Sequence, residues 1–117
     1  MKFALITAVL LSSIGLANLA NAASVDKGQA LVEKANCASC HGVGLNAPIL
    51  PAYPKLAGQY PDYLFYALKA YKVGNSNAQF GRTNAIMGSQ VQNFSDTDLH
   101  DIAAYISSLP GNFVVKK

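Results

Sequence analysis

Both cysteines of this chain lie in one five-residue stretch, Cys37-Ala38-Ser39-Cys40-His41. Two cysteines are too few for a scaffold built on disulfides, which needs several pairs. Cys-x-x-Cys-His is instead the attachment signature of c-type haem. Two thiols three positions apart can add to the two vinyl groups at one porphyrin edge, and the next residue offers an imidazole to the iron. We therefore predict one covalently bound haem c, attached through Cys37 and Cys40, with His41 as an iron ligand.

Three other interpretations of the motif exist: a redox-active thiol pair, a plain disulfide and half of a zinc site. A thioredoxin-like pair accompanies a βαβ pattern, and no segment here alternates apolar and polar residues as a strand does. A structural zinc ion takes four ligands, and the chain offers only Cys37, Cys40, His41 and His100. Haem is favoured, and a haem-free exported thiol or disulfide protein remains the alternative.

The first 22 residues have the pattern of a secretory signal peptide. Lys2 precedes a largely apolar run over residues 3–11, and Ala20-Asn21-Ala22 supplies the small residues that a signal peptidase reads. We expect cleavage after Ala22, export to a periplasm, and one monohaem domain over residues 23–117 that is not stably inserted in the membrane. The alternative is an uncleaved anchor, because residues 3–20 could nearly span a bilayer.

The charge of the chain is small. Its formal net charge is +3, and removal of Lys2 with the leader lowers this to +2. No basic run is longer than Lys116-Lys117, so a nucleic-acid-binding function is not supported. At 117 residues the chain has room for one domain.

The fold class expected from the pattern is all-α, with about three main helices. The first runs over residues 25–35 behind a Ser24 cap, the second from Pro61 to residue 72, and the third over residues 96–109 behind a Ser95 cap. Two long stretches between them, residues 42–60 and 73–94, are rich in Gly, Asn and Pro and are expected to be loops. Long loops in so small a domain make sense if the chain wraps a group that is not protein.

A haem iron needs a sixth ligand or a deliberate vacancy. Met87 is the one methionine beyond the leader, and it falls in the second expected loop, outside any apolar helical face. A lone methionine is more often core filler. With a haem present, however, the His/Met ligand pattern of electron-carrying cytochromes favours Met87. The rival is His100 in the first turn of the third helix, where a solvated histidine is the ordinary expectation.

These motifs together resemble those of the class I c-type cytochromes, especially small periplasmic monohaem members and single halves of two-haem relatives. The resemblance covers residues 24–109. Only one Cys-x-x-Cys-His is present, without an internal repeat, which indicates a single haem. The residues that carry the resemblance are Cys37-Ala38-Ser39-Cys40-His41-Gly42, Pro54-Lys55-Leu56-Ala57-Gly58-Gln59, Met87, Asn93-Phe94-Ser95-Asp96 and Ala103-Ala104-Tyr105-Ile106.

The resemblance implies a small cytochrome c fold wrapped around one covalent haem. It implies thioethers at Cys37 and Cys40, with His41 and Met87 as the axial ligands. The carbonyl of Pro54 would accept a hydrogen bond from the far nitrogen of His41, which fixes the ring and raises its basicity.

Further positions take roles by the same resemblance. Leu56 would pack on the porphyrin, and Gly28 would meet Tyr105 where the first and last helices cross. Some members of the family use a Trp near a haem propionate, and this chain has none. Gln59 and Arg82 are the possible substitutes.

A His/Met-ligated iron leaves no open coordination position, which suits a one-electron carrier rather than an enzyme. The expected partners are larger redox proteins (a dehydrogenase, reductase or oxidase) that dock transiently through small interfaces. Lysines such as Lys55, Lys69 and Lys72 could shape the docking face. The alternative function is a haem protein with a displaceable sixth ligand that acts as a peroxidase-like enzyme or gas binder.

Overall fold

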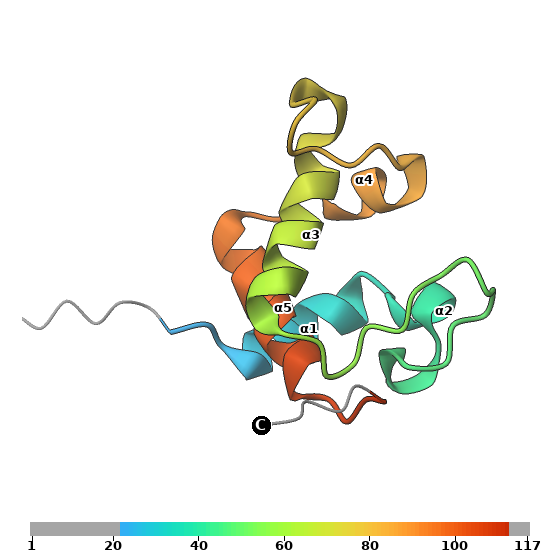
Figure 1. The fold of residues 1–117 in the computed structure, drawn as a ribbon. Helices are drawn as coiled ribbons and strands as arrows, with labels where there is room; N and C mark the ends of the chain where they lie inside the picture. Colours follow the sequence, from blue (N-terminus) through green and yellow to red (C-terminus); the bar gives the residue numbers. More distant parts are fainter. Residues whose placement is uncertain (1–21, 113–117) are drawn as a thin grey trace, which may run out of the picture.

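The computed structural model describes residues 22–112, and every regular element in this range is helical (Figure 1). This confirms the all-α fold class. The predicted leader, residues 1–22, lies outside the described residues except for Ala22. Among the helices that are described, none combines the length and apolar character needed to cross a membrane. The elements are α1 (Val25–Lys34), α2 (Ala38–His41), α3 (Pro61–Val73), α4 (Ala85–Val91) and α5 (Asp96–Ser108), with short 3₁₀ turns η1 (Val43–Leu45) and η2 (Gly74–Ser76).

The three long helices begin where local chemistry predicts. The Ser24 hydroxyl accepts a hydrogen bond from the Lys27 amide at 3.2 Å, which caps α1. Pro61 occupies the start of α3, where its missing N–H costs nothing. At α5, Ser95 and Asp98 exchange side chain-to-backbone hydrogen bonds of 3.1 and 3.0 Å, forming a complete capping box. The expected boundaries of these helices are therefore correct to within one residue.

Helices α1 and α5 cross at a glycine. A Cβ added to Gly28 would lie 1.9 Å from the carbonyl oxygen of Asp101 and 2.8 Å from Cβ of Tyr105. The expected meeting of Gly28 with Tyr105 is thus present, and it explains why a residue that weakens the helix stands there. Next to this crossing, the buried Asp101 carboxylate accepts a hydrogen bond of 2.7 Å from the Ser24 amide. Both contacts hold the start of α1 on α5.

The hydrophobic core lies among the three long helices. Leu99 on α5 is completely buried at its centre, and α3 packs against both α5 and α4. The buried members of this core are Val32, Leu45, Leu64, Phe65, Val91, Leu99, Ile102, Ala103 and Ile106.

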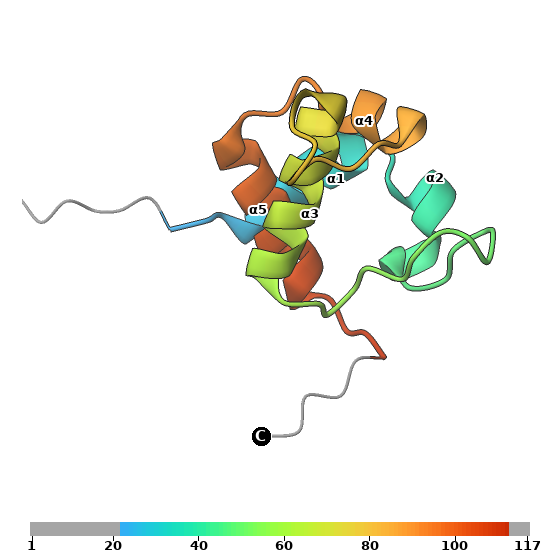
Figure 2. The ribbon, with the colours of Figure 1, turned by 45° about the horizontal axis from the view of Figure 1, so that its top comes forward.

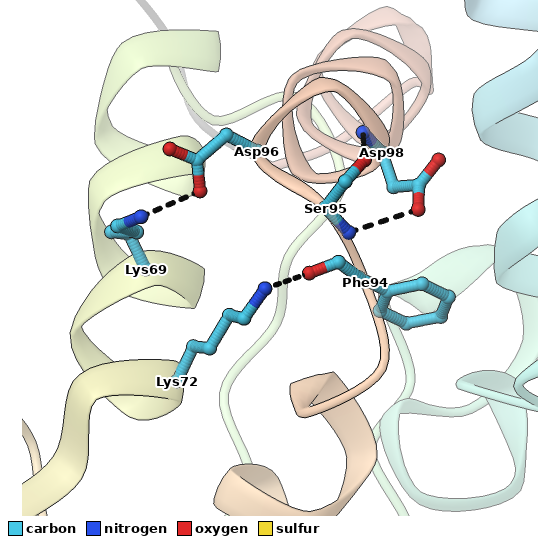
Figure 3. A network of polar contacts seen from close by, with 6 residues as sticks. All are labelled: Lys69, Lys72, Phe94, Ser95, Asp96 and Asp98. Carbon is cyan, nitrogen blue, oxygen red and sulfur yellow. Dashed lines mark hydrogen bonds and ion pairs between the residues drawn. The ribbon is translucent and has the colours of Figure 1, made fainter.

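Two lysines of α3 fasten the N-terminal end of α5 (Figure 3). Lys69 forms an ion pair of 2.6 Å with Asp96, and the Lys72 ammonium donates to the carbonyl oxygen of Phe94. Figure 3 shows both side chains reaching from α3 toward the turn that precedes α5, beside the Ser95–Asp98 capping box.

The prediction that residues 73–94 form a loop is wrong in part. The seven residues Ala85–Val91 form α4. The Asn84 side-chain oxygen accepts a hydrogen bond of 2.9 Å from the Met87 backbone N–H and so caps the helix. Two turns are too short to show a helical period in sequence, and Gly88 inside α4 lowers its apparent propensity. The first expected loop, residues 42–60, is largely irregular after η1.

Helix α2 and the segment between η1 and α3 lie to one side of the α1, α3 and α5 group (Figures 1 and 2). In both views this green segment projects away from the three long helices. The Cys-x-x-Cys-His motif therefore sits on a separate arm of the fold, carried by α2.

Candidate functional site

Helix α2 gathers the motif on one helical turn. The Cys40 and His41 amides both donate to the Cys37 carbonyl, at 3.3 and 3.0 Å. Positions i, i+3 and i+4 share one side of a helix, so both sulfurs and the imidazole project from the same face. The two sulfurs are not bonded to each other. Burial raises the pKa of the Cys37 thiol, which keeps the unattached sulfur protonated near neutral pH.

The imidazole of His41 is buried, with 7% of the residue exposed. Its Nδ1 lies 2.8 Å from the carbonyl oxygen of Pro54. A carbonyl oxygen only accepts hydrogen bonds, so Nδ1 carries the proton and Nε2 keeps its lone pair. The contact that the resemblance implied for Pro54 is thus present, and it leaves Nε2 as the nitrogen that can bind a metal.

The segment after the motif is shaped by Gly42, a residue to which sequence analysis gave no role of its own. Gly42 has a φ of +80°, and an added Cβ would lie 1.6 Å from the Ala47 carbonyl oxygen. Farther along, the Leu56 amide donates to the Leu45 carbonyl at 2.9 Å. These contacts fold the chain back on itself and bring Pro54 to His41. The signal available in sequence was the glycine directly after the motif.

Met87 lies on α4 rather than in a loop. Its side chain is partly buried and packs against the core. Helix α4 rests on the C-terminal half of α3, where the Tyr71 carbonyl oxygen is 3.6 Å from the position of a Cβ on Gly88. Met87 and His41 thus stand on two different short helices, and Figures 1 and 2 show both helices on the same side of α3, with α4 above α2.

His100 takes a different position. Its ring stacks on Phe65 with a centroid separation of 3.6 Å and an interplanar angle of 5°. Within residues 22–112, no three His, Cys, Asp or Glu side chains are close enough together to hold a metal ion. His100 therefore does not join Cys37, Cys40 and His41, and the four-ligand zinc interpretation has no support in the described part of the chain.

Three further candidates from the sequence are Leu56, Gln59 and Arg82. Leu56 is partly buried and packs against the core, and the side-chain Nε2 of Gln59 donates to the Lys55 carbonyl oxygen at 2.7 Å. The Arg82 guanidinium stands 6.0 Å from the ring centre of Tyr63 and 5.5 Å from that of Tyr71. The neighbouring Tyr63 and Tyr71 side chains raise the pKa of Arg82 above its ordinary value. Neither tyrosine is among the site residues that the sequence predicts.

The donor set fits a haem c. Attachment of this group requires two thiols at a fixed spacing and one neutral imidazole nitrogen beside them. The face of α2 supplies all three, and the hydrogen bond to Pro54 sets the required tautomer of His41.

Comparison with known proteins agrees with this chemistry. The family model described as cytochrome c matches residues 25–110. Cytochrome c4 from Stutzerimonas stutzeri is 41% identical over 107 residues, which cover 88% of this chain and 50% of the relative. Cytochrome c-554(548) from Halomonas halodenitrificans is 42% identical over 72 residues, which cover 62% of this chain and 82% of the relative.

The fold is likewise similar to a solved structure. The crystal structure of reduced recombinant cytochrome c4 from Pseudomonas stutzeri superposes with a TM-score of 0.67 at 39% identity, covering 78% of this chain and 48% of that one. The chain spans about half the length of the cytochrome c4 relatives that it matches. The expected cofactor is that of the matched family, which binds haem c covalently. The chain belongs to the cytochrome c family and has the class I c-type fold.

Proposed function

We propose that this protein is a one-electron carrier, not an enzyme, which works in the periplasm through a single His/Met-ligated haem c. The observation that carries the proposal is the hydrogen bond of 2.8 Å from His41 Nδ1 to the Pro54 carbonyl. It holds a buried imidazole in the tautomer that presents Nε2 to a metal. When bound, haem c supplies an iron that cycles between the ferric and ferrous states.

In this proposal Cys37 and Cys40 form the thioether bonds, and His41 and Met87 are the axial ligands. The helical turn at α2 supports the roles of Cys37, Cys40 and His41, because it aligns these three side chains on one face. The role of Met87 is supported by its partly buried position on a capped helix. A ligand on an ordered helix needs little rearrangement when the iron changes charge. A thioether sulfur also raises the reduction potential relative to harder ligands.

The surroundings of these ligands have supporting roles. Pro54 orients His41, and we assign to Leu56 a packing contact with the porphyrin. With His41 and Met87 both bound to the iron, a substrate would have no ready access to the metal. The partners are then larger redox proteins (a dehydrogenase, reductase or oxidase) that exchange electrons during brief encounters.

The proposal includes export. Residues 1–22 would be removed as a signal peptide, leaving residues 23–117 as one monohaem domain. The mass and N-terminal sequence of protein matured in an exporting host test this directly, and the expected first residue is Ala23. An N-terminus at Met1 would instead indicate an uncleaved anchor.

An optical spectrum from the visible into the near infrared, recorded on protein matured in that host, tests the haem site. We expect a covalent c-type spectrum with the weak ferric band of a methionine–iron bond. A covalent haem without that band, together with rapid binding of carbon monoxide to the ferrous protein, would favour the peroxidase-like or gas-binding alternative. Protein without any haem would refute both.

A further inference from the structure

The segment that follows the haem-attachment motif is exposed, apolar and free of charge. Between Lys34 and Lys55 the sequence contains no Asp, Glu, Lys or Arg. Within this stretch Val43 is 88% exposed, Ile49 61% and Leu50 48%. We call residues 43–54 the apolar loop. Apolar side chains gathered at the surface in one ordered segment mark a contact site more often than scattered ones do.

The apolar loop is held in a defined shape. The Ile49 amide donates to the Cys40 carbonyl at 3.0 Å, and the Tyr53 amide donates to the Leu50 carbonyl at 3.0 Å. At its end, Pro54 is fixed by His41. A surface that is already ordered loses little conformational entropy when a partner covers it. The same bonds tie the loop to Cys40 and His41, so a partner on the loop is close to the attachment site.

Two of the three lysines considered for a charged docking face, Lys69 and Lys72, are engaged elsewhere. The third, Lys55, is exposed and directly follows the apolar loop. Lys69 pairs with Asp96, and Lys72 donates to the Phe94 carbonyl, so both fasten α5 (Figure 3). These contacts lie on the α3 and α5 side of the fold, whereas the apolar loop belongs to the arm that carries α2 (Figure 2). The charges of Lys69 and Lys72 therefore belong to the contact between α3 and the start of α5, and residues 43–54 themselves carry no charge.

We propose that the apolar loop is the docking surface for electron exchange, and that its partner is a redox protein whose contacting surface is also apolar and uncharged. This inference rests on the proposed function and names the chemistry of its partner. Residues 43–54 offer no charge for a charged surface to match, so a charged partner would find only Lys55, at the end of the loop. Two copies of this chain present each other with such a surface, which makes a second copy a suitable probe.

The experiment is electron self-exchange in a mixture of ferric and ferrous holoprotein, measured by NMR line broadening. One electron passes from the ferrous copy to the ferric copy, so the reaction needs no other reagent. We expect the wild-type rate to change by less than about twofold between low and high salt, because no charged contact is screened. Amide signals of residues 43–54 are expected to shift most as the protein concentration rises.

Charge introduced into the loop provides the sharper test. Ile49→Glu and Val43→Glu place like charges opposite each other in the encounter, and we expect each to slow self-exchange by about tenfold at low salt, with recovery at high salt. Val25→Glu is the matched control, because Val25 is 42% exposed and lies on α1 outside the loop. The control should stay within about twofold of wild type.

The proposal is overturned if the loop variants exchange at the wild-type rate, or if Val25→Glu slows exchange equally. A steep decrease of the wild-type rate with salt would also overturn it and assign docking to a charged surface. The spectrum and reduction potential of each variant separate this failure from that of the proposed function. If a loop variant keeps the wild-type spectrum and reduction potential and also keeps the wild-type self-exchange rate, the proposed docking surface is wrong and the proposed function stands.

Discussion

The buried imidazole of His41 donates its Nδ1 hydrogen to the carbonyl oxygen of Pro54 at 2.8 Å. The two partners are thirteen positions apart in the sequence, and the bond links α2 to the end of the apolar loop. It therefore fixes two things together: the tautomer of the ligand and the path of the chain that surrounds it.

Because that proton is buried and bonded, we expect the Nδ1 hydrogen of His41 to exchange slowly with solvent in the reduced holoprotein, measured by proton NMR. Pro54→Ala keeps the carbonyl acceptor but frees the backbone of the unfolded chain. The signal should therefore persist, while the free energy of unfolding falls by about 0.4–1 kcal/mol. Loss of the signal in Pro54→Ala would show that the ring of Pro54, and not only its carbonyl, sets the position of His41.

Replacement of Met87 tests the sixth ligand. Met87→Ala should abolish the weak ferric near-infrared band, allow the ferrous protein to bind carbon monoxide, and lower the reduction potential by part of the roughly 0.8 V range that axial ligands span. Ile86→Ala is the matched control, because Ile86 is the preceding residue of α4 and is exposed. A Met87→Ala protein with an unchanged band and potential would contradict the ligand assignment.

The long helices could be predicted from sequence because their determinants are local. Ser24, Pro61 and the Ser95–Asp98 pair act within one turn of the residues they cap. Helix α4 could not be predicted from sequence. Its seven residues show no clear helical period, and its cap, Asn84, stands in a stretch rich in turn residues. The consequence was an error about Met87, which was placed in a loop.

The candidate site likewise has one part that local sequence predicts and one part that it does not. Cys37, Cys40 and His41 come together through helical spacing alone, so the motif was enough. The bond from His41 to Pro54 was expected only through the family resemblance, since no local rule connects residues so far apart. The pairing of Lys69 with Asp96, which are separated by 27 positions, had no signal in the sequence. Such contacts depend on how α3 and α5 pack.

The crossing of α1 and α5 predicts a pair of glycine variants with opposite effects. Gly28→Ala forces a Cβ to within 1.9 Å of the Asp101 carbonyl oxygen, so the helices must separate, and we expect a loss of about 1–3 kcal/mol in the free energy of unfolding. In Gly88→Ala the nearest such atom, the Tyr71 carbonyl oxygen, is 3.6 Å away, an ordinary contact. That variant should gain about 0.5–1 kcal/mol from helix propensity. Chemical denaturation of the holoprotein measures both, and equal effects would contradict the close crossing.

The ion pair between α3 and α5 predicts a dependence of stability on pH. The hydrogen bond from Lys69 holds the pKa of the Asp96 carboxyl below its ordinary value, with smaller contributions from the charges of Lys69, Lys72 and His100. A lowered pKa in the folded state means that the contribution to stability is complete above the unfolded value of about 3.9 and is lost as the pH falls through the folded value. The gap in unfolding midpoint between wild type and Lys69→Met should therefore be constant near neutral pH and close below about pH 4. Lys55→Met is the control, since the Lys55 charge is not among those acting on Asp96. A gap that persists unchanged in acid would show that Lys69 acts on α5 through packing of its alkyl chain rather than through Asp96.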